Sequence, residues 1–208
     1  MLADYTYELH PLTRDEFPSF MEQHAFRAIN VTIPYKQDVI PYLSDIDDTA
    51  KEIGAVNTIV NRNGRLSGYN TDMPGFMYMV RKNGIDMKGK KVVILGNGGA
   101  SQAVQAGVKH LGASEQIIVG HRTMKDGVIT YEECFDRHAD ADIIVNTSPV
   151  GMFPAIDASP VDLTKFPQCH AVVDIIANPL TTKLVAQARD LGMTGITGLE
   201  MLVAQAKY

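Results

Sequence analysis

One short run constrains the fold of this chain more than any other part of the sequence. It is Val92–Ser101, which reads VVILGNGGAS. The leading apolar residues, most of them β-branched, predict a buried strand, the glycines predict a tight turn, and the stretch Gln102–Leu111 can form a helix. This order suits a dinucleotide, because glycines let the backbone approach a pyrophosphate and free N–H groups at the start of a helix point at the anion.

The run departs from the Gly-x-Gly-x-x-Gly fingerprint of dinucleotide-binding turns. Gly96 and Gly98 occupy the first two glycine positions, but Ser101 stands at the third. Many strand-to-helix turns contain glycine only because glycine tolerates positive φ. The turn alone therefore leaves a purely structural role open.

Composition narrows the class of protein. The 208 residues suffice for one large domain or two small ones, and the apolar fraction of 45% is ordinary for a globular protein with a core. The formal charge of -5 argues against a nucleic-acid partner. The sequence has no apolar stretch long enough for a membrane span, and Met1–His10 lacks the apolar core of a secretion signal. We therefore expect a cytoplasmic protein that binds neither nucleic acid nor membrane.

The cysteines and histidines give no sign of a metal site. Cys134 and Cys169 are isolated, and the six histidines are scattered without close spacing. Zinc ligands usually come in closely spaced pairs. We therefore predict no metal and a reducing compartment, in agreement with the cytoplasm.

The pattern of apolar residues changes near Thr71–Gly75. Before this point we predict a helix at Thr13–His24, where Thr13 can cap the helix and Glu16 follows three residues later. Short strands are predicted at Tyr5–Leu9, Ala28–Ile33, Ala55–Asn61 and Arg65–Tyr69, with a turn at Asn63-Gly64 between the last two.

Beyond this point, buried strands alternate with helices. A connecting helix is predicted at Pro74–Asn83, and strands are predicted at Lys91–Leu95, Gln116–Gly120, Asp142–Asn146, Ala171–Ile176 and Thr194–Ile196. Such alternation predicts a parallel, doubly wound sheet. The expected fold class is α/β: a Rossmann-type parallel-sheet domain, residues 72–197, plus a smaller α/β domain, residues 1–71, completed by residues 198–208.

The end of the second strand of the parallel sheet indicates which dinucleotide binds. An acidic residue there suits the ribose 2′-hydroxyl of NAD, whereas a basic residue suits the 2′-phosphate of NADP. This strand is followed by His121, Arg122 and Thr123, and no acid stands at its end. A guanidinium binds a phosphate through paired hydrogen bonds, so we favour NADP, although Arg122 by itself could also be a solvated loop cation.

Other candidates for chemistry stand at strand ends. Lys36 follows a strand that is stopped by Pro34, and a lysine near a pocket can exchange protons, although most lysines are only solvated. Asn57 and Asp72 also follow strands, where they can bind a polyol or merely cap turns and helices.

Seven motifs in a fixed order resemble the shikimate dehydrogenase family. They cover nearly the whole chain: NVTIPYK at residues 30–36, GAVNT at 54–58, GYNTD at 68–72, GNGGAS at 96–101, HRT at 121–123, NTSPVGM at 146–152 and GLEMLVAQA at 198–206. The resemblance implies NADPH-dependent reduction of 3-dehydroshikimate to shikimate, a step of aromatic amino-acid biosynthesis. It also implies that residues 1–71 form the substrate-binding domain.

The resemblance also implies roles for particular residues. Lys36 would be the catalytic lysine and Asp72 its paired carboxylate, while Thr32, Asn57 and Gln205 would bind the substrate. The implied cofactor-binding residues are Gly96, Gly98, Gly99, Ala100, His121, Arg122, Thr123, Thr147, Ser148, Ile175 and Gly198.

The chain also departs from the family pattern. The family opens with a strand and a Ser-x-Ser motif for the substrate carboxylate, whereas this chain begins after that point and ends before the last helix of the family finishes. Ala177 replaces a substrate-side tyrosine, His121 an asparagine, and Asn97 lies inside the glycine turn.

Two alternatives to the enzyme of this family follow from these departures. One is a truncated, catalytically impaired paralogue that binds NADP(H) without turnover. The other, quinate oxidation with NAD, is disfavoured because no acid follows the second strand. A shortened substrate domain that exposes apolar surface would also be compatible with a homodimer.

Overall fold

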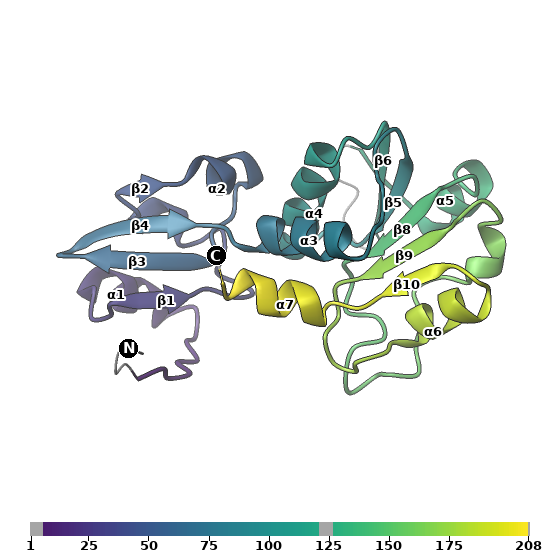
Figure 1. Ribbon diagram of the computed structural model, residues 1–208. Coiled ribbons are helices and arrows are strands. Elements are labelled where there is room, and N and C mark those ends of the chain that lie inside the picture. The colour runs from purple at the N-terminus through teal and green to yellow at the C-terminus, as the bar shows by residue number, and fades with distance from the viewer. Residues whose placement is uncertain (1–5, 121–126, 208) are drawn as a thin grey trace.

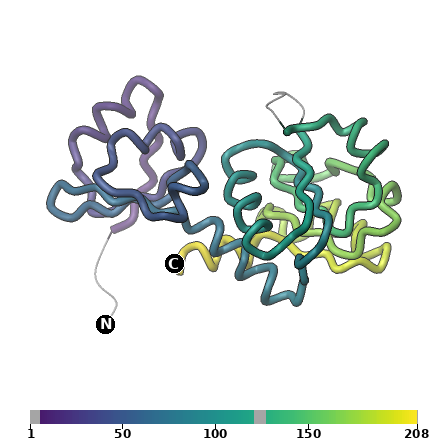
Figure 2. Tube along the Cα trace, turned by 90° about the horizontal axis from the view of Figure 1, so that it is seen from above, coloured from purple at the N-terminus to yellow at the C-terminus, as the bar shows by residue number. Residues whose placement is uncertain are grey.

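The computed structural model describes residues 6–120 and 127–207. Within these residues the strands form two sheets, one of four strands and one of six. Figure 1 shows the two sheets in two lobes, and Figure 2 shows the same two lobes from above. Helices α3 (Asp72–Lys82) and α7 (Leu199–Gln205) pack against each other, and through them the chain passes from the smaller lobe to the larger one and back.

The smaller sheet has the strand order β1-β3-β4-β2. Strands β3 (Thr58–Arg62) and β4 (Arg65–Tyr69) form the predicted hairpin, whose turn residues Asn63 and Gly64 have φ of 55° and 85°. The remaining elements of this lobe are α1 (Phe17–Gln23), β1 (Ala28–Asn30), the 3-10 turn η1 (Ile40–Tyr42), β2 (Asp45–Ile46) and α2 (Asp48–Ile53).

Two predictions for this lobe need correction. Glu16 does accept a hydrogen bond from the backbone N–H of Thr13 at 2.9 Å, but the regular helix begins only at Phe17. Residues 6–9 form no strand, although apolar and polar residues alternate there. Tyr7 and Leu9 are 68% and 88% exposed, so strand formation would bury no apolar face.

The larger sheet is parallel and has the strand order β10-β9-β8-β5-β6-β7. Its strands are β5 (Lys91–Leu95), β6 (Glu115–Val119), β7 (Val128–Ile129), β8 (Ile143–Asn146), β9 (Ala171–Asp174) and β10 (Thr194–Ile196). The strand order reverses between β5 and β8, and open α/β sheets bind ligands outside the strand ends at such a point. The predicted α/β class with a Rossmann-type sheet is confirmed.

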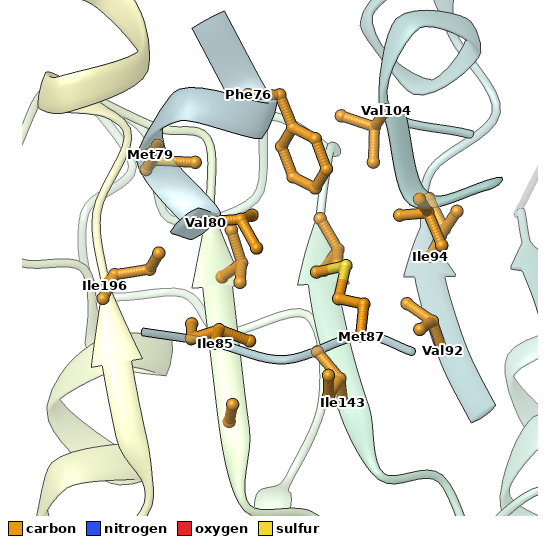
Figure 3. Packing of buried hydrophobic residues seen from close by; sticks show 14 of the residues in the cluster. Phe76, Met79, Val80, Ile85, Met87, Val92, Ile94, Val104, Ile143 and Ile196 are labelled. Atoms are coloured by element: carbon orange, nitrogen blue, oxygen red, sulfur yellow. The ribbon is translucent and has the colours of Figure 1, made fainter. Parts of the chain in front are cut away.

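Helices cover both faces of this sheet. Successive strand residues point to opposite sides, and apolar side chains on each side are buried. Val92 and Ile94 of β5 belong to the same buried cluster as Phe76 and Met79 of α3, and Figure 3 shows α3 lying over this face of the sheet. Val93 and Leu95 face the other side. The helical elements around the sheet, besides α3 and α7, are α4 (Gly99–His110), α5 (Tyr131–Arg137), the 3-10 turn η2 (Leu163–Lys165) and α6 (Lys183–Asp190).

A close crossing of α3 and α7 returns the end of the chain to the smaller lobe. A Cβ at Gly75 would lie 3.0 Å from the carbonyl oxygen of Met201, so glycine allows this approach. The crossing also places Gln205 beside the first turn of α3. No helix in the described part of the chain has the length and apolar character that a bilayer crossing requires.

Candidate active site

A nearly buried ion pair lies at the start of α3. Lys36 Nζ donates to Asp72 Oδ2 at 2.6 Å, and the two side chains are only 15% and 7% exposed. Lys36 comes from the loop after β1, while Asp72 is the first residue of α3. Because water has little access to these two side chains, the attraction between the ammonium and the carboxylate fixes the orientation of Lys36. A lysine held in one orientation can donate a proton to an acceptor at a defined position.

The three predicted substrate residues differ in burial and in their position relative to this pair. Asn57 is 6% exposed, and its Oδ1 accepts from the backbone N–H of Thr71 at 2.9 Å while its Nδ2 donates to Thr71 Oγ1 at 3.0 Å. Asn57 therefore braces the residue before Asp72. Gln205 lies against Gly75 in the first turn of α3, so the structure brings it to the same end of the helix. Thr32 is exposed in the loop that leads to Lys36.

The glycine-rich turn lies between β5 and α4, as predicted. A Cβ at Gly98 or Gly99 would meet no heavy atom within 4 Å, so the backbone at the start of α4 is open to a ligand. The first turn of α4 contains no acidic residue. Open backbone N–H groups at the start of a twelve-residue helix fit a pyrophosphate.

The ends of β5 and β8 are joined beside this turn. Gly96 has a φ of 108°, and a Cβ there would lie 2.8 Å from Thr147 Oγ1. The hydroxyl of Thr147 donates to the carbonyl of Leu95 at 2.8 Å, and that of Ser148 donates to Asn146 Oδ1 at 2.7 Å. Both side chains therefore have protein partners at the carboxyl ends of β5 and β8.

A hydrogen bond links the loop that contains Lys36 to the first turn of α4, which follows the glycine turn. Gln37, next to Lys36, donates to Gln102 of the first turn of α4 at 3.1 Å. A ligand on the open backbone of α4 would thus lie close to the Lys36–Asp72 pair. A dinucleotide bound near a proton donor can take part in hydride transfer that is coupled to proton transfer.

Comparisons with known proteins agree with this geometry. The shikimate dehydrogenase substrate binding domain family matches residues 2–59. A shikimate dehydrogenase (NADP(+)) from Halothermothrix orenii is 43% identical in an alignment of 204 positions, which covers 88% of this chain and 70% of the relative. This chain belongs to the shikimate dehydrogenase family.

Solved structures of the family share the fold. A chorismate mutase/shikimate 5-dehydrogenase fusion protein from Clostridium acetobutylicum matches with a TM-score of 0.89 and 35% identity, over 97% of this chain and 76% of that one. A shikimate 5-dehydrogenase from Thermus thermophilus in complex with NADP(H) and shikimate matches with a TM-score of 0.80 and 32% identity, over 93% and 76%.

Two residues that the family resemblance assigns to the cofactor meet at the end of β9. A Cβ at Gly198 would overlap the carbonyl group of Ile175, so no other residue fits there without a backbone shift. The N–H of Gly198 donates to Ile176 O at 2.9 Å. Ala100 is the second residue of α4, after Gly99. His121, Arg122 and Thr123 lie outside the described residues, and Gly120 before them lies against Asn97 in the glycine turn.

The buried carboxylate of Asp174 was not predicted from the sequence. Asp174 is fully buried at the end of β9, where it accepts from Thr182 Oγ1 at 2.6 Å, Asn146 Nδ2 at 3.1 Å and the backbone N–H of Ile176 at 3.1 Å. Burial raises the pKa of Asp174, and these hydrogen bonds oppose the rise. The network ties the loops after β8 and β9 together. An aspartate at the end of an apolar strand was the available signal.

Proposed function

We propose that this chain catalyses the NADPH-dependent reduction of 3-dehydroshikimate to shikimate, within aromatic amino-acid biosynthesis. The observation that carries the proposal is the nearly buried Lys36–Asp72 pair beside the helix that starts at the glycine turn. Relatives named shikimate dehydrogenase (NADP(+)) that match most of the chain support the same activity.

The ion pair supplies the proton of this reaction. When bound, NADPH supplies a hydride to the carbonyl carbon of the substrate. The ketone oxygen then needs a proton, which the Lys36 ammonium donates, and the neutral amine regains a proton from water. Asp72 holds the Lys36 ammonium in one orientation before the transfer. As the carbonyl oxygen becomes negative, the nearby ammonium also stabilises the developing charge.

The proposed substrate contacts lie on the smaller lobe. Thr32, Asn57 and Gln205 bind hydroxyl groups of the substrate in this proposal, and Asn57 has an amide hydrogen to offer besides the one that Thr71 accepts. We accordingly assign residues 1–71 with residues 198–208 to the substrate domain, and residues 72–197 to the NADP-binding domain.

The proposed cofactor contacts lie on the larger lobe. Gly96, Gly98, Gly99 and Ala100 surround the pyrophosphate, supported by the open space beside the second and third of these residues. His121, Arg122 and Thr123 hold the 2′-phosphate. Thr147, Ser148, Ile175 and Gly198 border the nicotinamide half through the shape of their backbone.

The direct test incubates the chain with shikimate and NADP and follows the absorbance of NADPH. We expect NADPH to form. We expect slower formation of the reduced cofactor when NAD replaces NADP, in which case the product is NADH, or when quinate replaces shikimate. NADP binding by calorimetry without turnover would overturn the proposal in favour of the impaired paralogue. A homodimer and a cytoplasmic location stay predictions, and sedimentation velocity checks the first.

A further inference from the structure

Three consecutive residues of the smaller lobe lie between Lys36 and Asp72 and contact both sides. The backbone N–H of Val56 donates to the carbonyl of Lys36 at 2.8 Å. On the opposite side, Asn57 binds Thr71 through its side chain, and the carbonyl of Ala55 accepts a hydrogen bond from Asn70 Nδ2 at 2.9 Å. The segment Ala55–Asn57 thus fixes where the two members of the ion pair stand.

Asn70 has the central position in this arrangement. Its side chain is buried, and its Oδ1 accepts from the backbone N–H groups of Asp72 and Met73 at 3.0 and 3.4 Å. It therefore caps α3, a task that the side chain of the N-cap residue Thr71 does not perform. Through Nδ2 the same side chain ties the start of α3 to Ala55.

A helix cap alone does not require asparagine. Serine and aspartate also accept hydrogen bonds from the first N–H groups of a helix. An ionised aspartate has no hydrogen to donate. Serine has a single hydroxyl on a shorter side chain, whereas Asn70 uses two separate atoms, Oδ1 for the helix and Nδ2 for Ala55. We propose that Asn70 is a positioning residue, which holds Asp72 at ion-pair distance from Lys36 by joining the start of α3 to the segment Ala55–Asn57.

This inference rests on the proposed function, but its test does not depend on turnover. The variant Asn70→Ser keeps a cap for α3 and loses the bond to Ala55. The first readout is hydrogen exchange with water at the Lys36 ammonium, followed by nuclear magnetic resonance. In the parent protein the ion pair and its burial slow this exchange, and we expect it to be faster in the variant. The second readout is kcat, which we expect to fall about 10- to 100-fold while KM for NADPH stays the same.

Asn83→Ser is the matched control. Asn83 lies at the other end of α3, where its Nδ2 donates to Met79 O and to Glu200. We expect this variant to lower thermal stability without changing kcat or exchange at Lys36. If Asn70→Ser keeps both parental kcat and parental exchange, Asn70 is only a helix cap and the inference is wrong.

A second variant keeps the inference testable if Asn70→Ser does not fold. Asn70→Asp keeps the size of the side chain and its acceptor, replaces the donor toward Ala55 with an oxygen, and adds a negative charge near Asp72. We expect a folded protein with reduced kcat, and an undiminished kcat would overturn the inference. If the parent chain itself shows no turnover, the proposed function fails, and exchange at Lys36 in Asn70→Ser still decides the role of Asn70.

Discussion

The two halves of the candidate site differ in the groups that they present, which are side chains on the smaller lobe and backbone on the larger one. On the smaller lobe the site consists of side chains that hold one another, since Asn57, Asn70 and Asp72 are all buried and hydrogen-bonded to protein groups. On the larger lobe it consists of backbone, because the space beside Gly98 and Gly99 contains no protein atom within 4 Å of an added Cβ. One half is preorganised for chemistry, and the other is shaped to admit a ligand.

This difference separates rate from affinity. A side chain removed from the smaller lobe takes away a group that acts on the substrate, so turnover should suffer most. A methyl group added to the larger lobe fills space that a cofactor needs, so affinity should suffer most. Substitutions in each half can therefore test whether the smaller lobe determines kcat and the larger lobe determines cofactor affinity.

The largest effect is expected for Lys36→Ala. The variant loses the proton donor, and removal of a general acid lowers kcat by about 10²–10⁴-fold. NADP affinity, measured by calorimetry, should not change. Lys51→Ala is the control, because Lys51 pairs with Asp48 on the surface, where both side chains are more than half exposed. A Lys36→Ala variant that keeps most of its kcat would remove the proposed role of the ion pair.

Arg122→Ala should act on affinity alone. A charge-assisted hydrogen bond to a phosphate contributes about 1.5–3 kcal/mol, so the Kd for NADP should rise about 10- to 100-fold. The Kd for NAD, which lacks the 2′-phosphate, should change much less. Equal losses for the two cofactors would show that Arg122 does not recognise the 2′-phosphate.

Two glycines of one turn offer a sharper contrast. Gly98 has a φ of −82° and open space, so Gly98→Ala should fold normally and weaken NADP binding about tenfold by crowding the pyrophosphate. Gly96 has a φ of 108° and contacts Thr147, so Gly96→Ala should also lower thermal stability, by about 1–3 kcal/mol. Calorimetry and thermal unfolding of both variants distinguish the two effects. Equal stability losses would mean that the turn tolerates no methyl group at either position.

Local patterns in the sequence predicted most of the larger lobe. The four apolar residues before Gly96 form β5 together with Lys91, and the alternation of buried strands with helices does produce the parallel sheet. These features depend on neighbours in the chain, so periodicity and glycine spacing reveal them. The Tyr5–Leu9 strand was predicted from the same kind of pattern and is absent from residues 6–9, because strand formation also needs a partner that local sequence does not specify.

Most contacts between distant residues escaped prediction. The family resemblance did imply that Lys36 and Asp72 form a pair, and the fold shows their side chains in contact at 2.6 Å. Asn70 and Ala55 are 15 residues apart, and Asn146 and Asp174 are 28 apart. Such partners are chosen by sheet order and helix packing, so the hydrogen bonds that position the site could not be deduced from spacing.

The smallest effect concerns the buried carboxylate network at the end of β9 on the larger lobe. Burial raises the pKa of Asp174 above its ordinary value of 3.8, with Thr182, Ile176 and Asn146 opposing the rise. The folded protein therefore holds this proton more tightly than the unfolded chain does. The stabilising contribution of the protonated form is complete below the unfolded pKa and is lost as the pH rises through the folded pKa.

The variant Asp174→Asn has no proton to lose at this position. Relative to the variant, the parent protein should lose unfolding free energy as the pH rises from about 4, by about 1.4 kcal/mol for each unit of pKa difference between the folded and unfolded states. Urea unfolding at a series of pH values measures this difference. Surface carboxylates whose pKa is lowered, such as Asp140 and Asp162, change stability in the opposite direction, but they are common to both proteins and cancel. A difference that grows in favour of the parent as the pH rises would mean that the hydrogen bonds to Asp174 outweigh its burial, and that this edge of the cofactor half is held by charge rather than merely by shape.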